Sequence, residues 1–479
     1  MQLHKKINSI RLVYAYVFLY FIVLLFFSFS LNGTGDDGDS IVHYFYSKYA
    51  FIHPSFFLNH WAKPFFVFLS APFAQFGFIG IKVFNILNST IALYFTYKIA
   101  EQLKIKNAPI ALVFFTFIPL HFLLTLSGLT EPLCSMMLSV ALYFIVKNKL
   151  IVAVLIFSFL PFVRSEGLVL CGVLFVWLCW TKQWKYIPYI LVGHVLYSLI
   201  GLVLFSKSLL WIFTEIPYAK LSSHYGHGTW YHYFKKMPEY LGYPFTLLLS
   251  ISLFVFIKFI IKNTKSLFKH PDKYVVYSLA YPLFYAFLFF HVIAWALGLF
   301  GSFGLLRVFV AVSPIVAIML LQAYNYITDI KLFSTKMVSY SLLLILVLCT
   351  IFIYNFGMFR KDLYTLNVHQ QLINSLVTEI KKEYPDYQER KIVSSAAQTY
   401  LVLNRDSFDP TLASNFYEIN LETQKVKTLF IWDEWYAASE DGMSYELLAN
   451  NPHIKLIHYY HKKDMQKNLR RVALFEKIN

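Results

Sequence analysis

Long apolar runs with few charges recur along the chain up to about residue 357, and they predict membrane-spanning helices. The first run, 12–35, is long enough to cross a hydrocarbon core, which takes about 20 helical residues. It ends in Asn-Gly-Thr-Gly-Asp-Asp rather than in a small-residue cleavage site, so we expect a retained span and not a signal peptide. Ten further runs have span character: 82–100, 108–127, 131–147, 149–164, 166–181, 186–206, 241–261, 274–298, 306–328 and 337–357. The sequence therefore predicts about eleven transmembrane helices.

One more apolar run, 64–81, is uncharged but interrupted by Pro72, Gly77 and Gly80. If it does not cross the membrane, every lysine-rich connection falls on the side of the amino terminus: 98–106, 147–149, 182–185, 262–273 and 331–336. Positively charged connections mark the cytoplasmic side. We therefore predict a cytoplasmic amino terminus and a juxtamembrane or re-entrant helix at 64–81 on the outer face.

After Asn355 the apolar runs shorten to strand length and charges become dense. Helical spacing of apolar residues covers 362–384. Short apolar stretches separated by Asp-Pro, Asp-Gly and Asn-Pro turns follow at 392–394, 400–403, 428–432, 455–459 and 472–475. We expect a transmembrane module, 1–358, followed by a small extracytoplasmic α/β domain, 359–479.

Composition agrees with a polytopic, α-helical membrane protein. Hydrophobic residues make up 58% of the chain and charged residues 14%, whereas a soluble chain has about 25% charged residues. The net charge of +16 is in part the topology signal, so it calls for no nucleic-acid partner. All four cysteines lie inside apolar runs, which excludes a disulfide scaffold. We expect the bacterial inner membrane as the location.

Acidic residues gather directly after the first span, at Asp36, Asp37 and Asp39. Three carboxylates this close repel one another unless cations or hydrogen-bond donors compensate, so one of them is a candidate general base. A solvated turn explains the cluster equally well, because Asp and Gly favour turns.

Two outer basic residues are candidate phosphate ligands. Lys63 follows His60 and opens the predicted juxtamembrane helix, so its ammonium would lie at headgroup depth, although an interfacial lysine that snorkels is the simpler alternative. Arg307 is a lone arginine on the outer side, which runs against the topology bias and calls for an anion nearby.

Glu131 and the pair Arg164 and Glu166 also lie at outer span ends. Each could be a capping acid or a charge at a helix end, and Arg164 and Glu166 could pair with each other.

Two aromatic-rich segments have weaker signals. His224, His227 and His232 have a spacing that permits a metal site, but an aromatic belt at the membrane interface explains this loop as well. The segment 432–435, Trp-Asp-Glu-Trp, could contact an acceptor, but a strand end followed by a turn explains it better.

The order of these motifs over the first two thirds of the chain resembles the polytopic GT-C glycosyltransferases, in particular relatives of the protein O-mannosyltransferases and of the bacterial transferases that add aminoarabinose or other sugars to lipid A. The motifs are Asp36-Asp37, Lys63-Pro64, Leu129-Thr130-Glu131-Pro132, Arg164, and Arg307 with Pro314. The first-loop motif reads Asp-Asp instead of the Asp-Glu common in protein mannosyltransferases, which leaves the class of acceptor open.

The resemblance implies an inverting transfer of a sugar from a polyprenyl phosphate donor to a lipid, glycan or protein acceptor on the outer face. It implies that Lys63, Arg164 and Arg307 bind the donor phosphate and that Asp36 takes the acceptor proton. Asp37 would be the second-choice base or a ligand of a divalent cation, with Glu131 as the other candidate ligand. The supporting polar residues would be Asp39, His60, Glu131 and Glu166.

Two other functions fit parts of the pattern. A transporter or lipid flippase predicts ionisable groups near the bilayer midplane and repeat symmetry between halves. A polysaccharide polymerase or ligase, which also uses lipid-linked glycans, favours several arginines in large outer loops.

Overall fold

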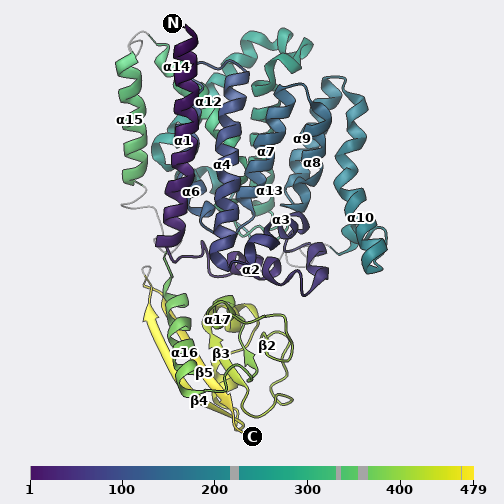
Figure 1. The fold of residues 1–479 in the computed structure, drawn as a ribbon, viewed down its shortest axis with the longest axis vertical. Coiled ribbons are helices and arrows are strands. Elements are labelled where there is room, and N and C mark those ends of the chain that lie inside the picture. The colour runs from purple at the N-terminus through teal and green to yellow at the C-terminus, as the bar shows by residue number, and fades with distance from the viewer. Residues whose placement is uncertain (1, 216–225, 331–335, 354–364, 465–466) are drawn as a thin grey trace.

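The computed structural model describes residues 2–215, 226–330, 336–353, 365–464 and 467–479. A bundle of helices makes up the amino-terminal part, and a small domain with a five-stranded sheet lies beyond one end of it (Figure 1). The amino terminus of helix α1 (Gln2–Ser30) lies at the opposite end of the bundle. The predicted combination of a helical membrane module with a carboxyl-terminal α/β domain is confirmed at this level.

Six helical segments of the described residues are long and apolar enough to cross a membrane: Ile10–Ser30, Phe78–Gln102, Trp184–Phe205, His232–Lys269, Val276–Ala296 and Leu306–Thr328. Five further apolar helices are shorter: Pro64–Ala74, Glu131–Val146, Leu150–Phe162, Gly167–Trp180 and Lys336–Ile351. Four of these shorter helices correspond to predicted spans. The predicted count of about eleven transmembrane helices is therefore not confirmed.

Two predicted boundaries are wrong for local reasons. The run 108–127 is two short helices, α5 (Ile110–Thr116) and α6 (Pro119–Thr125), because Pro119 lacks the N–H that a continuous helix needs.

The run 64–81 is also divided. It forms α3 (Pro64–Ala74) and then the first turn of α4 (Phe78–Gln102), with a break at Gly77, whose φ of 80° suits a residue without Cβ. At eleven residues α3 is too short to span a hydrocarbon core, which needs about 20, so the prediction of a non-crossing helix agrees with its length.

The segment between α1 and α3, left without secondary structure by the sequence pattern, contains α2 (Asp39–Tyr49) and the 3₁₀ helix η1 (Pro54–Leu58). Helix α2 packs against α3 and buries Ile41, Tyr44 and Phe45. Its first residue is Asp39, one of the three acids that follow the first span.

Five further elements of the bundle carry or adjoin the site. They are α7 (Glu131–Val146), η2 (Leu160–Phe162), α9 (Gly167–Trp180), α13 (Tyr281–Ala296) and η6 (Leu306–Val312), which continues into α14 (Ser313–Thr328).

The remaining helices complete the bundle: α8 (Leu150–Phe159), η3 (Trp184–Leu191), α10 (Val192–Phe205), α11 (Trp211–Thr214), α12 (His232–Lys269), η4 (Pro271–Tyr274), the π-helical η5 (Val276–Ala280) and α15 (Lys336–Ile353).

The carboxyl-terminal domain begins with α16 (Val368–Glu383), whose amino terminus is closed by a capping box of Asn367 and Gln370. Its strands have the order β2-β1-β3-β5-β4, parallel from β2 to β3 and antiparallel from β3 to β4. The strands are β1 (Ile392–Val393), β2 (Ala413–Ser414), β3 (Leu429–Asp433), β4 (Ile454–Lys463) and β5 (Leu469–Lys477).

Helical turns complete this domain. The apolar stretch 400–403 is part of a helix, α17 (Ala397–Leu403), rather than a strand. The π-helical turn η10 (Glu434–Glu440) directly follows β3, and α18 (Tyr445–Ala449) precedes β4. The predicted strand end followed by a turn at 432–435 is present.

Side chains of α2, of η1 and of the turn between them contact the carboxyl-terminal domain. His53 Nε2 lies 2.9 Å from Asp406 Oδ2, and Lys48 donates a hydrogen bond to Asn404. The ring of Phe408 packs against aromatic residues of the α2–η1 segment. The predicted division between 358 and 359 falls within 354–364, outside the described residues.

Candidate functional site

The candidate site lies at the end of the bundle that faces the carboxyl-terminal domain. We call this the site end; it comprises the loop 31–38 and the starts of α2, α3, α7, α9 and η6. Two glycines let the loop 31–38 and the start of α2 approach the segment before α7. A Cβ on Gly35, whose φ is 88°, would lie 2.3 Å from Ser127 Cβ, and a Cβ on Gly128 would lie 2.3 Å from the Ser40 carbonyl oxygen. The Gly128 N–H also donates to Ser40 Oγ at 2.7 Å. These contacts bring the first-loop acids against the rest of the site.

Arg307, in η6, is the centre of the site. Its guanidinium Nη1 lies 2.5 Å from Asp36 Oδ2, and its Nη2 donates to Asp39 Oδ2. Its Nε lies 3.6 Å from Glu131 Oε1. The anion that the sequence led us to expect beside Arg307 is thus supplied within the chain by three carboxylates.

Arg164, between η2 and α9, is the second basic member. Its Nη1 lies 2.7 Å from Glu131 Oε1, and its Nη2 lies 2.8 Å from Glu166 Oε1. Glu131 is fully buried at the first position of α7, where a carboxylate also interacts favourably with the helix dipole. The suggested pairing of Arg164 with Glu166 is present, and Glu131 connects the two arginines.

Lys63 lies next to this cluster and is buried, so it does not snorkel to solvent. It precedes α3 with a φ of 69°, and its Nζ donates to Ser165 Oγ at 2.9 Å and to the His60 carbonyl oxygen at 3.0 Å. Burial lowers the pKa of Lys63 to about 8, with the charge of Glu166 acting in the opposite direction. His60 takes part through its backbone.

Seven ionisable residues of the prediction therefore meet at the site end: Asp36, Asp39, Lys63, Glu131, Arg164, Glu166 and Arg307. Three cations face four carboxylates, so the basic groups are already compensated without a ligand. An anion that binds these basic groups would compete with the carboxylates.

Asp36 is the acid whose surroundings best suit a base. Its Oδ1 accepts backbone hydrogen bonds from Ser40 N at 2.8 Å and Gly38 N at 3.2 Å. Burial raises the pKa of Asp36 to about 7, against the effect of Arg307 and with a further rise from the charge of Asp39. A carboxyl group with a pKa near neutrality can both take and release a proton at physiological pH.

Asp37 points away from this cluster and into the carboxyl-terminal domain. Its Oδ2 accepts a hydrogen bond from Asn367 Nδ2 at 3.0 Å and lies 3.2 Å from His369 Nδ1, while its Oδ1 accepts from the Tyr436 hydroxyl at 3.1 Å. Against the effect of burial, His369 and Asn367 lower the pKa of Asp37. An acid held in its charged form by these partners is a poor proton acceptor, so the geometry favours Asp36 over Asp37 as the base.

The residues that surround Asp37 were not found from the sequence. His369, Asn367 and Tyr436 are more than 300 positions away in the chain, and each has an ordinary local explanation. The one available signal was the Asn-x-x-Gln capping box at 367–370, which predicts where α16 begins but not what lies opposite it. Ser165, which holds Lys63, had no signal.

The histidine loop shows no metal group in its described part. His224 lies outside the described residues, and His227 is exposed. His232 Nε2 lies 3.0 Å from the Gly304 carbonyl oxygen, and its ring packs near Trp295. Within the described part of the chain, the histidines of this loop are thus not gathered as ligands.

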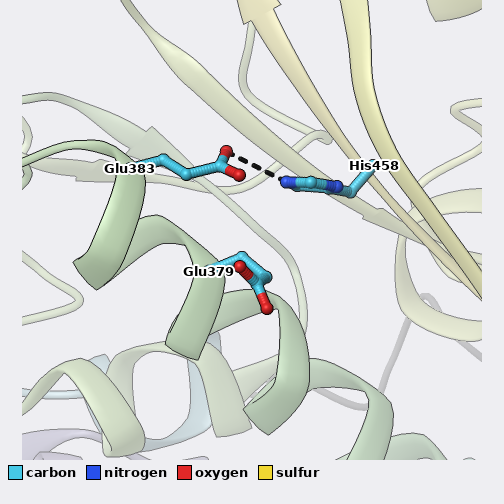
Figure 2. Close-up of side chains that lie close together, drawn as sticks. All are labelled: Glu379, Glu383 and His458. Carbon is cyan, nitrogen blue, oxygen red and sulfur yellow. Dashed lines mark hydrogen bonds and ion pairs between the residues drawn. The ribbon is translucent and has the colours of Figure 1, made fainter.

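A divalent cation held by Asp37 and Glu131 stays a prediction. In this structure the two carboxylates face different partners, Asn367 for Asp37 and Arg164 for Glu131. Among the described residues, one group of metal-ligand type occurs elsewhere, where Glu379 and Glu383 of α16 face His458 of β4 (Figure 2). His458 Nε2 lies 3.0 Å from Glu383 Oε2. This group lies in the carboxyl-terminal domain and belongs to a different part of the molecule from the predicted site.

The fold and the site together define a polytopic membrane protein with a charged cluster where the bundle meets a small α/β domain. Solved structures with this fold exist at low sequence identity. The chain is similar to ArnT from Cupriavidus metallidurans bound to undecaprenyl phosphate, with 12% identity, a TM-score of 0.58 and 98% of each chain covered. For the same protein in the apo state the identity is 11% and the TM-score 0.62, again with 98% of each chain covered.

These matches show, over nearly the whole chain, the kind of fold that the resemblance of the motifs implies. No protein-family model matches the chain. No curated protein sequence matches it either.

Proposed function

We propose that this protein is an inverting glycosyltransferase that moves a sugar from a polyprenyl phosphate donor to an acceptor at the site end. The observation that carries the proposal is the joining of Asp36 to Arg307 beside Arg164 and Lys63, on a fold that in ArnT accommodates undecaprenyl phosphate. A donor of this kind needs cations for one phosphate and an apolar surface for its lipid, and the site end of a membrane bundle offers both.

The proposed reaction opens one of the ion pairs, that of Asp36 with Arg307. The donor phosphate approaches Lys63, Arg164 and Arg307 and replaces Asp36 on Arg307. The released Asp36 carboxylate accepts the proton of the acceptor hydroxyl as the acceptor oxygen bonds to the anomeric carbon. The bond from that carbon to the phosphate oxygen breaks on the opposite face, which inverts the configuration. The leaving polyprenyl phosphate carries its charge among the cations, so the step needs no strong general acid.

The position of the buried charges favours a transferase over a transporter. Among the described residues of the bundle, the buried Lys and Glu side chains are those of Lys63, Lys82 and Glu131. They lie just before α3, in the second turn of α4 and at the first position of α7, all at helix starts. A transporter would place several such groups near the middle of the membrane. There the described residues include the buried His121, whose Nε2 lies 2.8 Å from Ser89 Oγ in the middle of α4.

The proposal includes a location in the bacterial inner membrane, with the amino terminus in the cytoplasm and the site outside. The proposed acceptor is a lipid, a glycan or a protein. The first-loop Asp-Asp does not choose among them.

The test is the product formed when purified protein in lipid nanodiscs is incubated with a panel of polyprenyl phosphate sugars and a membrane extract as acceptor source. We expect one donor to be consumed with release of polyprenyl phosphate, and we expect Arg307→Ala to abolish this release. Arg11→Ala is the matched control, because Arg11 is exposed and lies in the amino-terminal half of α1, away from the end that leads into the loop 31–38. Full turnover by Arg307→Ala, or no release from any donor by wild type, would contradict the proposal.

A further inference from the structure

The carboxyl-terminal domain encloses one side chain of the first loop with donors from two of its elements. Asn367 and His369 come from the start of α16, and Tyr436 comes from η10. All three lie within 3.2 Å of the Asp37 carboxylate. We call these residues the Asp37 clamp.

The clamp is itself held in place. The capping box fixes Asn367 at the start of α16, so its amide has a defined direction. Asp433 accepts backbone hydrogen bonds from the first residues of η10, including Tyr436 N at 2.7 Å, and thereby fixes the turn that presents the Tyr436 hydroxyl. His369 lies between two acids, with Nδ1 3.2 Å from Asp37 and Nε2 3.5 Å from Asp433 Oδ1. Against the effect of burial, these acids raise the pKa of His369 to about 10, which keeps the ring charged.

The carboxyl-terminal domain contacts the loop on both sides of Asp36. Before Asp36 in the chain, Gln370 Nε2 donates to Thr34 Oγ1 at 2.9 Å, and that hydroxyl donates to the Asp36 carbonyl oxygen. After Asp36, Gly38 lies so close to η10 that a Cβ there would be 2.7 Å from the Tyr436 hydroxyl oxygen. The backbone of Asp36 is thus held between two contacts with the carboxyl-terminal domain.

We infer that the carboxyl-terminal domain completes the active site, with His369 as a positioning residue that acts on Asp36 through Asp37. This inference rests on the proposed function, in which Asp36 is the base. It assigns a role in the reaction to a domain that the sequence resemblance left without one. The role is geometric: it sets the direction of the Asp36 carboxylate when that group is released from Arg307.

The inference is tested with three substitutions of His369. Asparagine places an amide where Nδ1 was and keeps the donor to Asp37. Glutamine places its amide where Nε2 was and keeps the contact with Asp433, while alanine keeps neither. We expect His369→Ala and His369→Gln to lower kcat about 10- to 100-fold, the scale of small misplacements in an active site, with KM for the donor changed less than about twofold. We expect His369→Asn to retain kcat within about threefold.

The matched control is His53, which joins the same two parts of the molecule through Asp406 but does not touch the loop 31–38. His53→Ala is expected to leave kcat unchanged. An equal loss of kcat in His53→Ala and His369→Ala would overturn the inference, because it would show a general effect of docking. Wild-type kcat in His369→Ala would overturn it as well, as would equal losses in the asparagine and glutamine variants.

If His369→Ala does not accumulate in membranes, Tyr436→Phe decides the matter, because it removes a single donor to Asp37 from a side chain that otherwise keeps its shape. A lower kcat with unchanged donor KM supports the clamp, and an unchanged kcat refutes it. Asp36→Asn separates the two levels of the argument. An inactive Asp36→Asn beside a fully active His369→Ala defeats only the clamp, whereas an active Asp36→Asn defeats the proposed base.

Discussion

Replacing Glu131 by glutamine tests whether the site is held together by buried ion pairs. Glu131 is completely buried, and its Oε1 lies 2.7 Å from Arg164 and 3.6 Å from Arg307. Removing one partner of a buried ion pair typically costs about 3–5 kcal/mol. Each arginine keeps another carboxylate in this variant: Glu166 lies 2.8 Å from Arg164, and Asp36 lies 2.5 Å from Arg307. We therefore expect the free energy of unfolding to fall by about 3 kcal/mol, the lower end of this range.

The assay is chemical unfolding of purified Glu131→Gln in one detergent, with Glu215→Gln as the matched control. Glu215 pairs with Lys207 at 2.6 Å, but half of its side chain is exposed, and such surface pairs contribute about 0–1 kcal/mol. We expect a clear decrease in unfolding free energy for Glu131→Gln and almost none for the control. Equal stability of the two variants would refute the reasoning that Glu131 links Arg164 to Arg307.

Three further predictions concern activity. Burial raises the pKa of Asp36 to about 7 in the protein without donor, so the base is protonated below this pH. The kcat/KM for the donor, which reports groups of the free enzyme, should therefore increase as pH rises through about 7 and then level off. A flat profile would argue against Asp36. Lys63→Gln should raise the KM for the donor about tenfold or more, because a charge-assisted hydrogen bond to the phosphate is worth about 1.5–3 kcal/mol. An unchanged KM in steady-state assays would show that Lys63 does not bind the phosphate. Gly38→Ala should lower kcat, because the added Cβ would clash with the Tyr436 hydroxyl. Combining it with Tyr436→Phe should restore part of the lost kcat. A normal kcat in Gly38→Ala would show that the loop can shift at this position without loss of activity.

Much of the fold follows from hydrophobic patterning, because membrane spans and helices need long apolar runs. The breaks were harder to place. Pro119 divides one predicted span, and Gly77 divides the run after Lys63, since a single residue without an N–H or a Cβ ends a helix inside an otherwise uniform pattern. The stretch 400–403 reads equally well as strand or helix, because a short buried segment has no distinct periodicity.

The candidate site was predictable where charge runs against the environment. Arg307, Arg164 and Glu131 attracted notice because ionisable groups at apolar span ends are costly without partners, and these residues do meet. The partners of Asp37 could not be predicted, because the contact between His369 and the first loop depends on how the carboxyl-terminal domain docks, and local sequence does not encode that docking. The roles of all these residues in a reaction remain predictions.

The most direct test of the central claim is single-turnover sugar transfer by Asp36→Asn in nanodiscs, with donor binding measured on the same sample. If Asp36 is the base that the donor phosphate releases from Arg307, binding should persist while transfer falls about 10²- to 10⁴-fold, the usual contribution of a positioned base. Transfer within a few-fold of wild type, with binding intact, would contradict the account.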